Sequence, residues 1–513
     1  MKLLSLHIFG HDSNLTYFDG KNVYYAKYER LYQKKHLEIF SMEDFEKTLK
    51  NEFNISISEI DEICICGAGI KNTLHVNFKD VIKKPFLRTL THKPLINYII
   101  DNSLNQIIFI DHHYCHALSA QFFYENEANI TFTIDGVGGT TSWAVFKLHK
   151  DIVRGNININ GSIGDGIYKV SSLFCKSSHL TDYAGKFMGL QSYAKTDEEY
   201  LQYLKKFNIE NLAMPHKITQ VGEYSFWSYK QYIKVTGKTS KKDKLNWGRT
   251  IHQRCGEIIL EHFKKYAKPD DVIHYAGGVA QNVIWNTELK KHFKNLIIEP
   301  PCGDEGLSLG GMEFLRRKYN LPKMKLENFP FSQTDQTTDE PTQETIDTVA
   351  KFLAEGKIVA WYQGHGEIGP RALGNRSLLM DPRIPDGKNK MNKVKNREYY
   401  RPFGASVLSE YAKEYFDLDF ENPYMLYIGV TQKDNLQSIT HVDGTCRAQT
   451  VDGNSAFRKL LESFHKLTGC PVLLNTSLNV SGNPIAGYIQ NAIDEFNSKD
   501  IDVLVVGNNI TTK

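Results

Sequence analysis

TFTIDGVGG, residues 131–139, is the stretch that decides the fold. It begins with β-branched and aromatic residues and ends in a glycine-rich turn, and residues 143–146 return as a second apolar run. This order of residue types is typical of a β-hairpin. The turn exposes backbone N–H groups and the carboxylate of Asp135, which together suit a phosphate and a hydrated cation that bridges phosphates.

A similar pattern occurs near the N-terminus. Residues 3–9 and 14–18 are apolar or aromatic runs, and the polar turn between them carries His11 and Asp12. Each copy alone is explained by an ordinary hairpin. Their repetition predicts two related halves that face one cleft.

Helical and extended patterns alternate further along the chain. Apolar spacing predicts a helix at residues 249–266, and the run at 272–276 predicts a strand. This alternation indicates an α/β fold. Residues 332–342 are polar apart from one proline and carry turn formers, so we expect a linker at residues 329–342 between a first domain, residues 1–328, and a second domain, residues 343–513.

Composition narrows the class of protein. A chain of 513 residues is longer than one hydrophobic core usually organises, so we expect two or three domains. A net charge of +3 is too small to indicate nucleic acid or a membrane surface as the partner. No window reaches the ~18 apolar residues of a membrane span and no secretory signal is visible, so we expect a cytoplasmic protein. The 8 cysteines include no Cys-x-x-Cys pair, which argues against a zinc ribbon.

Two histidines mark a candidate metal site. In DHHYCHALSA, residues 111–120, His112 and His116 are four positions apart at a predicted helix start and share one face of the helix. Asp304 lies in a Gly-flanked loop after a predicted strand and can complete a set of two histidines and one carboxylate. This set suits Fe(II), Mn(II) or Zn(II). The alternative is a pair of half-buried structural histidines.

Glycine-rich turns predict a nucleotide site in the first domain. Successive glycines at 277–278 let a planar base or a ribose lie against the backbone. In the second domain, basic residues between positions 371 and 401 predict binding of phosphates, because several lie beside Gly or Pro turns. A solvated basic face and a nucleic-acid patch are the alternatives.

These motifs resemble the O-carbamoyltransferases of nodulation and antibiotic biosynthesis. The resemblance rests on HHYCHA (112–117), DGVGG (135–139), GKFMGLQSYA (185–194), GGVAQN (277–282) and GDEG (303–306), followed by GHGEIGPRALGNRS (364–377), NREYYRPF (396–403) and LNTSLN (474–479). The blocks run in the family's order across almost the whole chain, and the GPRALG block is the specific one.

The resemblance implies a fold and an activity. The first domain is expected to be Kae1-like, of the actin, sugar-kinase and Hsp70 ATPase fold, and the second YrdC-like. The second domain would combine carbamoyl phosphate with ATP and Mg(II) to make carbamoyladenylate. The first would pass the carbamoyl group to a hydroxyl of a sugar, a nucleoside or another small acceptor. Its metal, expected to be Fe(II), would lie on His112, His116 and Asp304.

The resemblance also implies roles for other residues. The expected nucleotide-binding residues are Asp135, Gly136, Gly138, Lys186, Gly277, Gly278 and Asn282. The expected carbamoyl phosphate-binding residues are Arg371, Lys395, Arg401, Arg447 and Ser477. Catalysis is assigned to Lys395 and Arg401 and, from the residues of the first turn themselves, to His11 and Asp12. His11 is the candidate general base because its ordinary pKa is near neutrality, and a structural histidine is the alternative.

Two other functions are compatible with the motifs. One is modification of transfer RNA of the threonylcarbamoyl kind, against which the small net charge argues. The other is a nucleotide-binding scaffold without turnover. Hydrogenase-maturation carbamoyltransferases are a poorer match, because they place the YrdC-like part first and carry paired-Cys zinc motifs.

Overall fold

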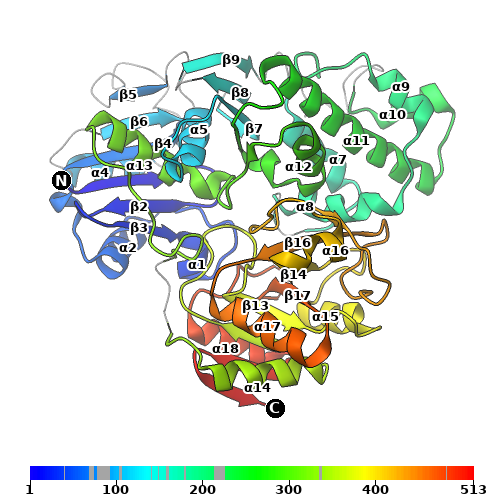
Figure 1. Ribbon diagram of the computed structural model, residues 1–513. Helices are drawn as coiled ribbons and strands as arrows, with labels where there is room; N and C mark the ends of the chain where they lie inside the picture. Colours follow the sequence, from blue (N-terminus) through cyan, green and yellow to red (C-terminus); the bar gives the residue numbers. More distant parts are fainter. Residues whose placement is uncertain are drawn as a thin grey trace. The chain divides into compact units, whose positions relative to one another are not determined.

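The structure is a computed structural model (Figure 1), and it describes residues 1–39, 41–68, 74–77, 93–102, 107–139, 141–147, 150–156, 161–177, 179, 181–212, 226–333, 338–480 and 482–513. The chain forms two compact units. Unit 1 contains Met1–Tyr28 and His36–Glu327, and unit 2 contains Glu29–Lys35 and Asn328–Lys513. Of the expected linker, residues 334–337 lie outside the described part of the chain.

The predicted α/β class is confirmed, with three mixed sheets. The first sheet of unit 1 has the order β3-β2-β1-β4-β6-β5. Its strands are β1 (Leu3–His7), β2 (Asn14–Phe18), β3 (Val23–Lys27), β4 (Glu62–Ala68), β5 (His75–Asn77) and β6 (Ile107–Asp111). The first three strands form an antiparallel meander, and β4 and β6 then add in parallel beside β1.

The second sheet of unit 1 repeats this topology in the order β11-β10-β7-β8-β9. Its strands are β7 (Ile130–Gly138), β8 (Thr141–Lys147), β9 (Lys150–Asn156), β10 (Ile273–Ala276) and β11 (Leu296–Ile297). The meander β7-β8-β9 is antiparallel, and β10 and β11 follow in parallel beside β7. The strand-turn-strand repeat of the sequence therefore corresponds to two sheets with the same strand order.

Two helices of unit 1 pack closely on one another and reach both sheets. Every residue of α5 (His112–Phe122) is buried, and the helix contacts β4, β7 and β10. Helix α13 (Leu307–Lys318) contacts β1, β2 and β4. A Cβ at Gly310 would lie 2.0 Å from the carbonyl oxygen of Cys115, so only glycine permits this approach of α13 to α5.

Further helices complete unit 1. They are α2 (Met42–Phe53), α4 (Lys93–Asn102), α7 (Ile163–Ser172), α8 (Asp182–Leu190), α9 (Glu198–Leu204), α10 (Tyr229–Thr236), α11 (Lys241–Tyr266) and α12 (Val283–His292), with short 3-10 turns η1 (Ile57–Glu59), η3 (Gln191–Tyr193), η5 (Gly278–Gln281) and η6 (Asp304–Gly306). Helix α11 begins earlier than its apolar spacing predicts, because Ser240 and Asp243 form a capping box at its N-terminus.

Unit 2 is built on an eight-stranded sheet of order β15-β16-β14-β17-β13-β12-β18-β19. The strands are β12 (Val359–Tyr362), β13 (Arg376–Met380), β14 (Gly404–Leu408), β15 (Gly429–Val430), β16 (Thr445–Val451), β17 (Val472–Ser477), β18 (Val503–Val506) and β19 (Asn509–Thr512). The helices are α14 (Gln343–Ala354), α15 (Gly387–Lys395), α16 (Ala412–Phe416), α17 (Ala456–Thr468) and α18 (Ile489–Ser498), with η7 (Ser409–Tyr411).

A segment from the N-terminal part of the chain belongs to unit 2. Residues Glu29–Lys35, which include most of α1 (Tyr28–Tyr32), fold with it. Arg30 donates from Nη2 to the carbonyl oxygen of Gly369 at 3.1 Å, and Gln33 donates to the carbonyl oxygen of Ile485. Sequence order alone therefore does not separate the two units.

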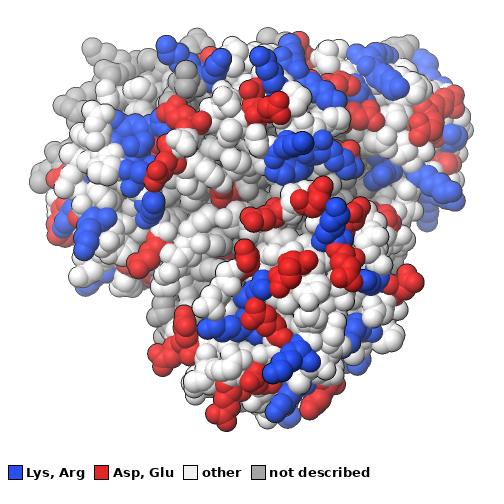
Figure 2. Space-filling view, in the orientation of Figure 1, with Lys and Arg blue, Asp and Glu red and all other residues white. Residues whose placement is uncertain are grey.

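The surface carries both signs of charge. Figure 2 shows lysine and arginine side chains interspersed with acidic ones over the visible face, in line with the net charge of +3. Among the described helices, none combines the length and the apolar character that a bilayer span requires.

Candidate functional site

Helix α5 places two histidines at the centre of unit 1. Asp111 is its N-cap residue, and the Asp111 carboxylate accepts a hydrogen bond from the backbone N–H of Tyr114 at 3.0 Å. The helix thus begins at His112, and the Nε2 atoms of His112 and His116 lie 3.1 Å apart. The structure therefore brings the two predicted ligands together.

Two carboxylates converge on this histidine pair. Asp304, in η6, places Oδ1 3.3 Å from Nε2 of His116 and 3.6 Å from Nε2 of His112. Asp135, on β7, places Oδ2 2.8 Å and 3.2 Å from the same two atoms. One ligand atom from each of the four residues lies within 4.8 Å of the other three.

The four side chains fit a metal ion. With bonds of about 2.1 Å, the ligand atoms of a tetrahedral site are about 3.4 Å apart, close to the separations of 2.8 to 3.6 Å here. Two imidazoles and two carboxylates suit divalent Fe, Mn or Zn. Sequence reasoning named His112, His116 and Asp304 but assigned Asp135 to the nucleotide, because the DGVGG turn carries no signal for the histidines that β7 meets.

The charges in this cluster are strongly coupled. Burial lowers the pKa of His116, but the carboxylates of Asp135 and Asp304 outweigh burial and raise that pKa to about 9. Burial raises the pKa of Asp135, yet His112 and His116 bring it well below the ordinary value. The pKa of Asp304 is also lowered, because the charge of His112 and of neighbouring histidines outweighs the effect of burial. Two anionic carboxylates thus face the imidazoles, which favours a cation in their midst.

Two glycines of the predicted nucleotide set pack against this cluster, and a third packs against the residue before Asp135. A Cβ at Gly138 would lie 2.5 Å from Cδ2 of His112, and a Cβ at Gly278 would lie 2.9 Å from Oδ1 of Asp135. Gly277 has φ +95° and its Cβ would meet the carbonyl oxygen of Ile134 at 2.2 Å. These glycines therefore allow two turns to approach the candidate metal ligands closely.

The remaining predicted nucleotide residues lie on nearby elements. Gly136 follows Asp135. A Cβ at Gly164, in the first turn of α7, would lie 2.7 Å from the backbone nitrogen of Gly136. Asn282 is the N-cap residue of α12, and its Nδ2 atom lies 3.0 Å from Nε2 of His252. Lys186, on α8, donates from Nζ to the carbonyl oxygen of Lys176.

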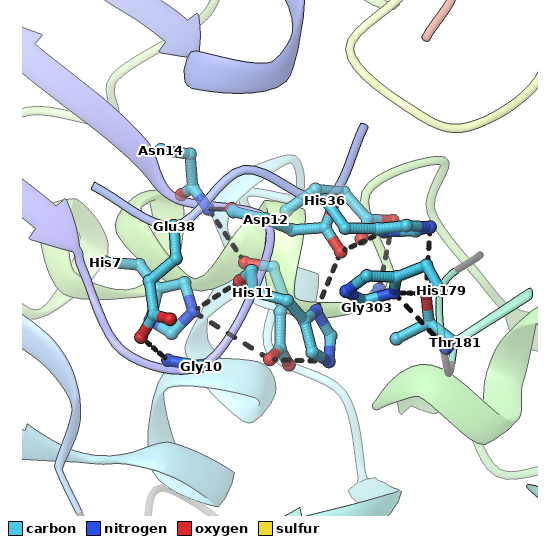
Figure 3. Close-up of polar contacts among 12 residues, drawn as sticks. His7, Gly10, His11, Asp12, Asn14, His36, Glu38, His179, Thr181 and Gly303 are labelled. Carbon is cyan, nitrogen blue, oxygen red and sulfur yellow. Dashed lines mark hydrogen bonds and ion pairs between the residues drawn. The ribbon is translucent and has the colours of Figure 1, made fainter. Parts of the chain in front are cut away.

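The predicted catalytic pair, His11 and Asp12, lies beside the candidate metal ligands. Figure 3 shows His11 and Asp12 in the turn after β1, with Nδ1 of His11 2.7 Å from Oδ2 of Asp12. Nε2 of His11 is 3.8 Å from Oδ2 of Asp304. His36, which the sequence did not single out for this pair, places Nδ1 3.1 Å from the same oxygen of Asp12.

A buried lysine organises the candidate site of unit 2. Lys395 ends α15 and is 4% exposed. Its Nζ donates to the carbonyl oxygens of Ser477 and Asn479 and to the Oδ1 atom of Asn479, and lies 3.2 Å from the Ser477 hydroxyl. The structure therefore brings Lys395 and Ser477 together and adds Asn479.

Half-buried guanidinium groups surround this lysine. Burial, followed by Arg397 and Arg401, holds the pKa of Lys395 well below its usual range. Burial also lowers the pKa of Arg447, and repulsion from the charge of Arg371 lowers it further. Nε of Arg447 has no hydrogen-bond partner among the described residues. Several cations therefore converge here, and the described carboxylates that act on them include Glu398, 3.7 Å from Arg401, and Glu495. Such a concentration of positive charge suits a polyanion.

Sequence reasoning gave no individual role to Arg397, one of the basic residues between positions 371 and 401, and did not assign Lys35 to this cluster. Arg397 stacks on Phe403 at 4.7 Å and lowers the pKa of Lys395. Lys35, from the N-terminal segment of unit 2, also lowers that pKa. The position of Arg397, two residues after Lys395, was available as a signal, whereas only the tertiary structure brings Lys35 to the cluster.

Not every basic residue of the region is available for a ligand. Arg376 is fully buried, stacks on Tyr362 at 3.6 Å and donates to the carbonyl oxygens of Gln363 and Gly364. Arg383 pairs with Asp381 at 2.7 Å. These two arginines bind neighbouring protein groups. We therefore do not count them among the cations around Lys395.

Comparison with known proteins defines the class as an enzyme that transfers carbamoyl groups. A family model described as Carbamoyltransferase N-terminus matches residues 2–312, and one described as Carbamoyltransferase C-terminus matches residues 350–513. The chain belongs to the carbamoyltransferase family.

Curated relatives match between half and nearly all of the chain. The nodulation protein NolNO of Sinorhizobium fredii is 28% identical over 80% of this chain and 64% of its own length. The 3'-hydroxymethylcephem-O-carbamoyltransferase of Amycolatopsis lactamdurans is 34% identical over 50% of this chain and 52% of its own. An uncharacterized protein of Methanocaldococcus jannaschii is 29% identical over 95% of this chain and 85% of its own.

Solved structures show only a distant likeness. HypF of T. kodakarensis is 12% identical over 63% of this chain and 48% of its own, with a TM-score of 0.37. The component A of a 2-hydroxyglutaryl-CoA dehydratase from Acidaminococcus fermentans is 13% identical over 62% of this chain and 99% of its own, also with a TM-score of 0.37.

Proposed function

We propose that this protein is an ATP-dependent O-carbamoyltransferase with two chemical steps. Unit 2 makes carbamoyladenylate from carbamoyl phosphate and ATP, and unit 1 transfers the carbamoyl group to a hydroxyl of a sugar, nucleoside or natural-product acceptor. The convergence of Arg397, Arg401 and other cations on the buried Lys395 is the observation that carries the proposal, since this concentration of positive charge suits anionic substrates. In this view unit 2 is YrdC-like and unit 1 is Kae1-like.

The activating step consumes two phosphoanhydride-type bonds. Water cleaves carbamoyl phosphate to carbamate and phosphate, and a carbamate oxygen then attacks the α-phosphorus of ATP and displaces pyrophosphate. Negative charge builds on both departing groups, and fixed cations stabilise it. We assign this task to Arg371, Lys395, Arg397, Arg401 and Arg447, with Mg(II) accompanying ATP.

Positioning in unit 2 follows from its hydrogen bonds. Ser477 ends β17, and its hydroxyl donates to Asn479 and lies next to Nζ of Lys395. The lysine is thereby held by neutral acceptors, and an anionic phosphate bound beside it would favour its charged form against the burial and the neighbouring arginines that lower its pKa. Planar guanidinium groups add bidentate contacts to phosphate oxygens.

In unit 1, His112, His116, Asp135 and Asp304 would hold a divalent metal, with Fe(II) as our assignment. A metal bound there supplies Lewis acidity that polarises a carbonyl or phosphoryl oxygen. The His11–Asp12 pair adjoins Asp304, and we assign it to the acceptor hydroxyl. The AMP part of the intermediate would lie against Gly136, Gly138 and the Gly277–Gly278 turn, with Lys186 and Asn282 on nearby elements.

The test separates the two steps. The full-length protein with ATP and labelled pyrophosphate should form labelled ATP only when carbamoyl phosphate is added, and no acceptor is needed for this exchange. His116→Ala should retain the exchange and lose carbamoyl transfer to acceptors screened from sugars, nucleosides and transfer RNA. Absence of exchange with any divalent metal would refute the proposal. Carbamoylation of transfer RNA alone would favour the RNA-modifying alternative instead.

A cytoplasmic location accords with this proposal, because ATP and carbamoyl phosphate are both cytoplasmic metabolites. The acceptor differs between enzymes that share activation chemistry. Screening of acceptors therefore follows, rather than precedes, the exchange assay.

A further inference from the structure

A second group of potential metal ligands lies in unit 1, beside the cluster of His112 and His116. One ligand atom from each of His11, Asp12 and His36 lies within 4.8 Å of the other two. Both Nδ1 atoms address the same oxygen, Oδ2 of Asp12, at 2.7 and 3.1 Å (Figure 3). Two imidazole nitrogens thus converge on one carboxylate oxygen from two different loops.

We propose that His11, Asp12 and His36 form a second site for a divalent first-row transition cation. Two imidazole nitrogens and one carboxylate oxygen are a donor set that binds Zn(II), Mn(II) or Fe(II) and leaves a coordination position open. The set shares no ligand with the first cluster, and the site is therefore separate from it.

The surroundings of His36 resemble those of a metal-bound histidine. Its Nε2 lies 2.8 Å from the hydroxyl of Thr181 and 3.4 Å from Oδ1 of Asp182. A ligating imidazole usually gives its other N–H to a carboxylate or hydroxyl, which fixes the ring and leaves the ligating nitrogen unprotonated. The ring of His179 stacks on His36 at 4.3 Å and further restricts it.

The backbone is also held for these side chains. Asp12 has φ 58° and His36 has φ 54°, in the left-handed region that non-glycine residues rarely adopt. This conformation costs on the order of 1 kcal/mol at each position. The strain accompanies the convergence of the donors and does not by itself define the site.

One neighbouring cation opposes the site. Nζ of Lys27 lies 3.0 Å from Oδ1 of Asp12, the oxygen that the histidines do not address. Asp12 can therefore bridge the ammonium group and a metal through its two oxygens. Asp182 and Asp304 add negative charge on the other sides of the histidines. The lysine should weaken metal binding without occupying the ligating oxygen.

A cation at this site deepens the function proposed for unit 1, and this consequence depends on that proposal. A cation held by His11, Asp12 and His36 would supply Lewis acidity that lowers the pKa of an acceptor hydroxyl. The existence of the site does not depend on the activity, because metal content is measured without substrate.

Zinc counting on the full-length chain tests the site. The protein is stripped with a chelator, incubated with Zn(II), desalted and analysed for zinc. Wild type should hold two zinc ions per chain, His116→Ala one, His36→Gln one, and the double variant none. His179→Gln is the matched control, since it alters the stacked ring without removing a ligand, and it should hold two. One zinc ion in wild type, or two in His36→Gln, would overturn the proposal.

Two further measurements cover a variant that fails to fold. Zinc anomalous scattering from wild-type crystals should show a second peak bonded to Nδ1 of His36 at about 2.1 Å; a single peak at the first cluster would refute the site. Lys27→Gln should bind the second zinc about 10-fold more tightly, because the opposing charge is removed. Equal or weaker affinity would count against ligation by Asp12.

Discussion

His116 and Asp135 meet through Nε2 and Oδ2 at 2.8 Å, although they lie on α5 and β7 and 19 residues separate them. The contact forms because α5 packs on β7 and because Gly138 allows the strand to approach the ring of His112. An aspartate that the sequence assigns to a nucleotide thus faces the two histidines that we propose as metal ligands.

Replacement of Asp135 tests this relationship. Asp135→Asn should lower the affinity of the first site for Fe(II) at least about 100-fold, because an anionic ligand is lost at the histidine pair. Metal titration of the purified variant measures the change. Asp452→Asn, at an exposed position in unit 2, is the control and should retain wild-type affinity. Unchanged affinity in Asp135→Asn would show that three ligands suffice.

We expect the cation cluster of unit 2 to lower the stability of the ligand-free protein and to increase its activity. Arg447→Met should raise the thermal unfolding midpoint of the ligand-free protein, because it removes repulsion with Arg371. The same variant should lose pyrophosphate exchange about 100-fold or more, since a fixed positive charge is missing. Calorimetry and the exchange assay measure the two effects. A variant with a lower midpoint and intact exchange would contradict this account.

Binding of an anionic ligand should offset the repulsion among the clustered cations and raise the free energy of unfolding. Carbamoyl phosphate at 100 times its Kd should stabilise wild type by about 2.7 kcal/mol, measured as a shift in the denaturation midpoint. Arg447→Met should show little of this shift. An equal shift in both proteins would place the ligand elsewhere.

Glu367 positions the loop that carries Arg371. Its Oε1 accepts hydrogen bonds from the backbone N–H groups of Leu373, Asn375 and Arg376 at 2.8, 3.1 and 3.2 Å. Glu367→Ala should destabilise the fold by about 3 kcal/mol, because buried N–H groups lose their acceptor. Chemical denaturation checks this value. A loss below about 1 kcal/mol would mean that the loop finds other partners.

Glu299 should produce a pH-dependent part of the stability of unit 1. Burial raises the pKa of this carboxyl to about 7, although its hydrogen bond from Tyr124 acts in the opposite direction. The folded protein therefore holds a proton that the unfolded chain releases near pH 4.5. The stabilisation is complete below that pH and is lost as the pH rises through about 7.

The expected size of this effect is about 3 kcal/mol, since one pKa unit corresponds to about 1.4 kcal/mol. Glu299→Gln should flatten the decline of unfolding free energy between pH 4.5 and pH 7.5. Urea denaturation across this range measures the difference between the two proteins. Parallel pH profiles would indicate that the carboxyl of Glu299 is ionised in the folded protein.

Local sequence determined much of the fold. The hairpin pattern around Asp135 and its copy around Asp12 specify meanders that are now β7-β8-β9 and β1-β2-β3, because alternation and turn residues act over a few positions. The spacing of His112 and His116 likewise specifies one helix face, and Asp111 caps that helix.

Tertiary structure alone decided which distant groups share a site. Asp135 joins the histidines, His36 joins Asp12, and Lys35 folds with unit 2 rather than with its sequence neighbour His36. Such contacts depend on how buried helices and sheets pack, which is set by the shapes of side chains far apart in the chain and not by any local pattern. Periodicity specifies elements and faces, whereas packing specifies which of those faces meet.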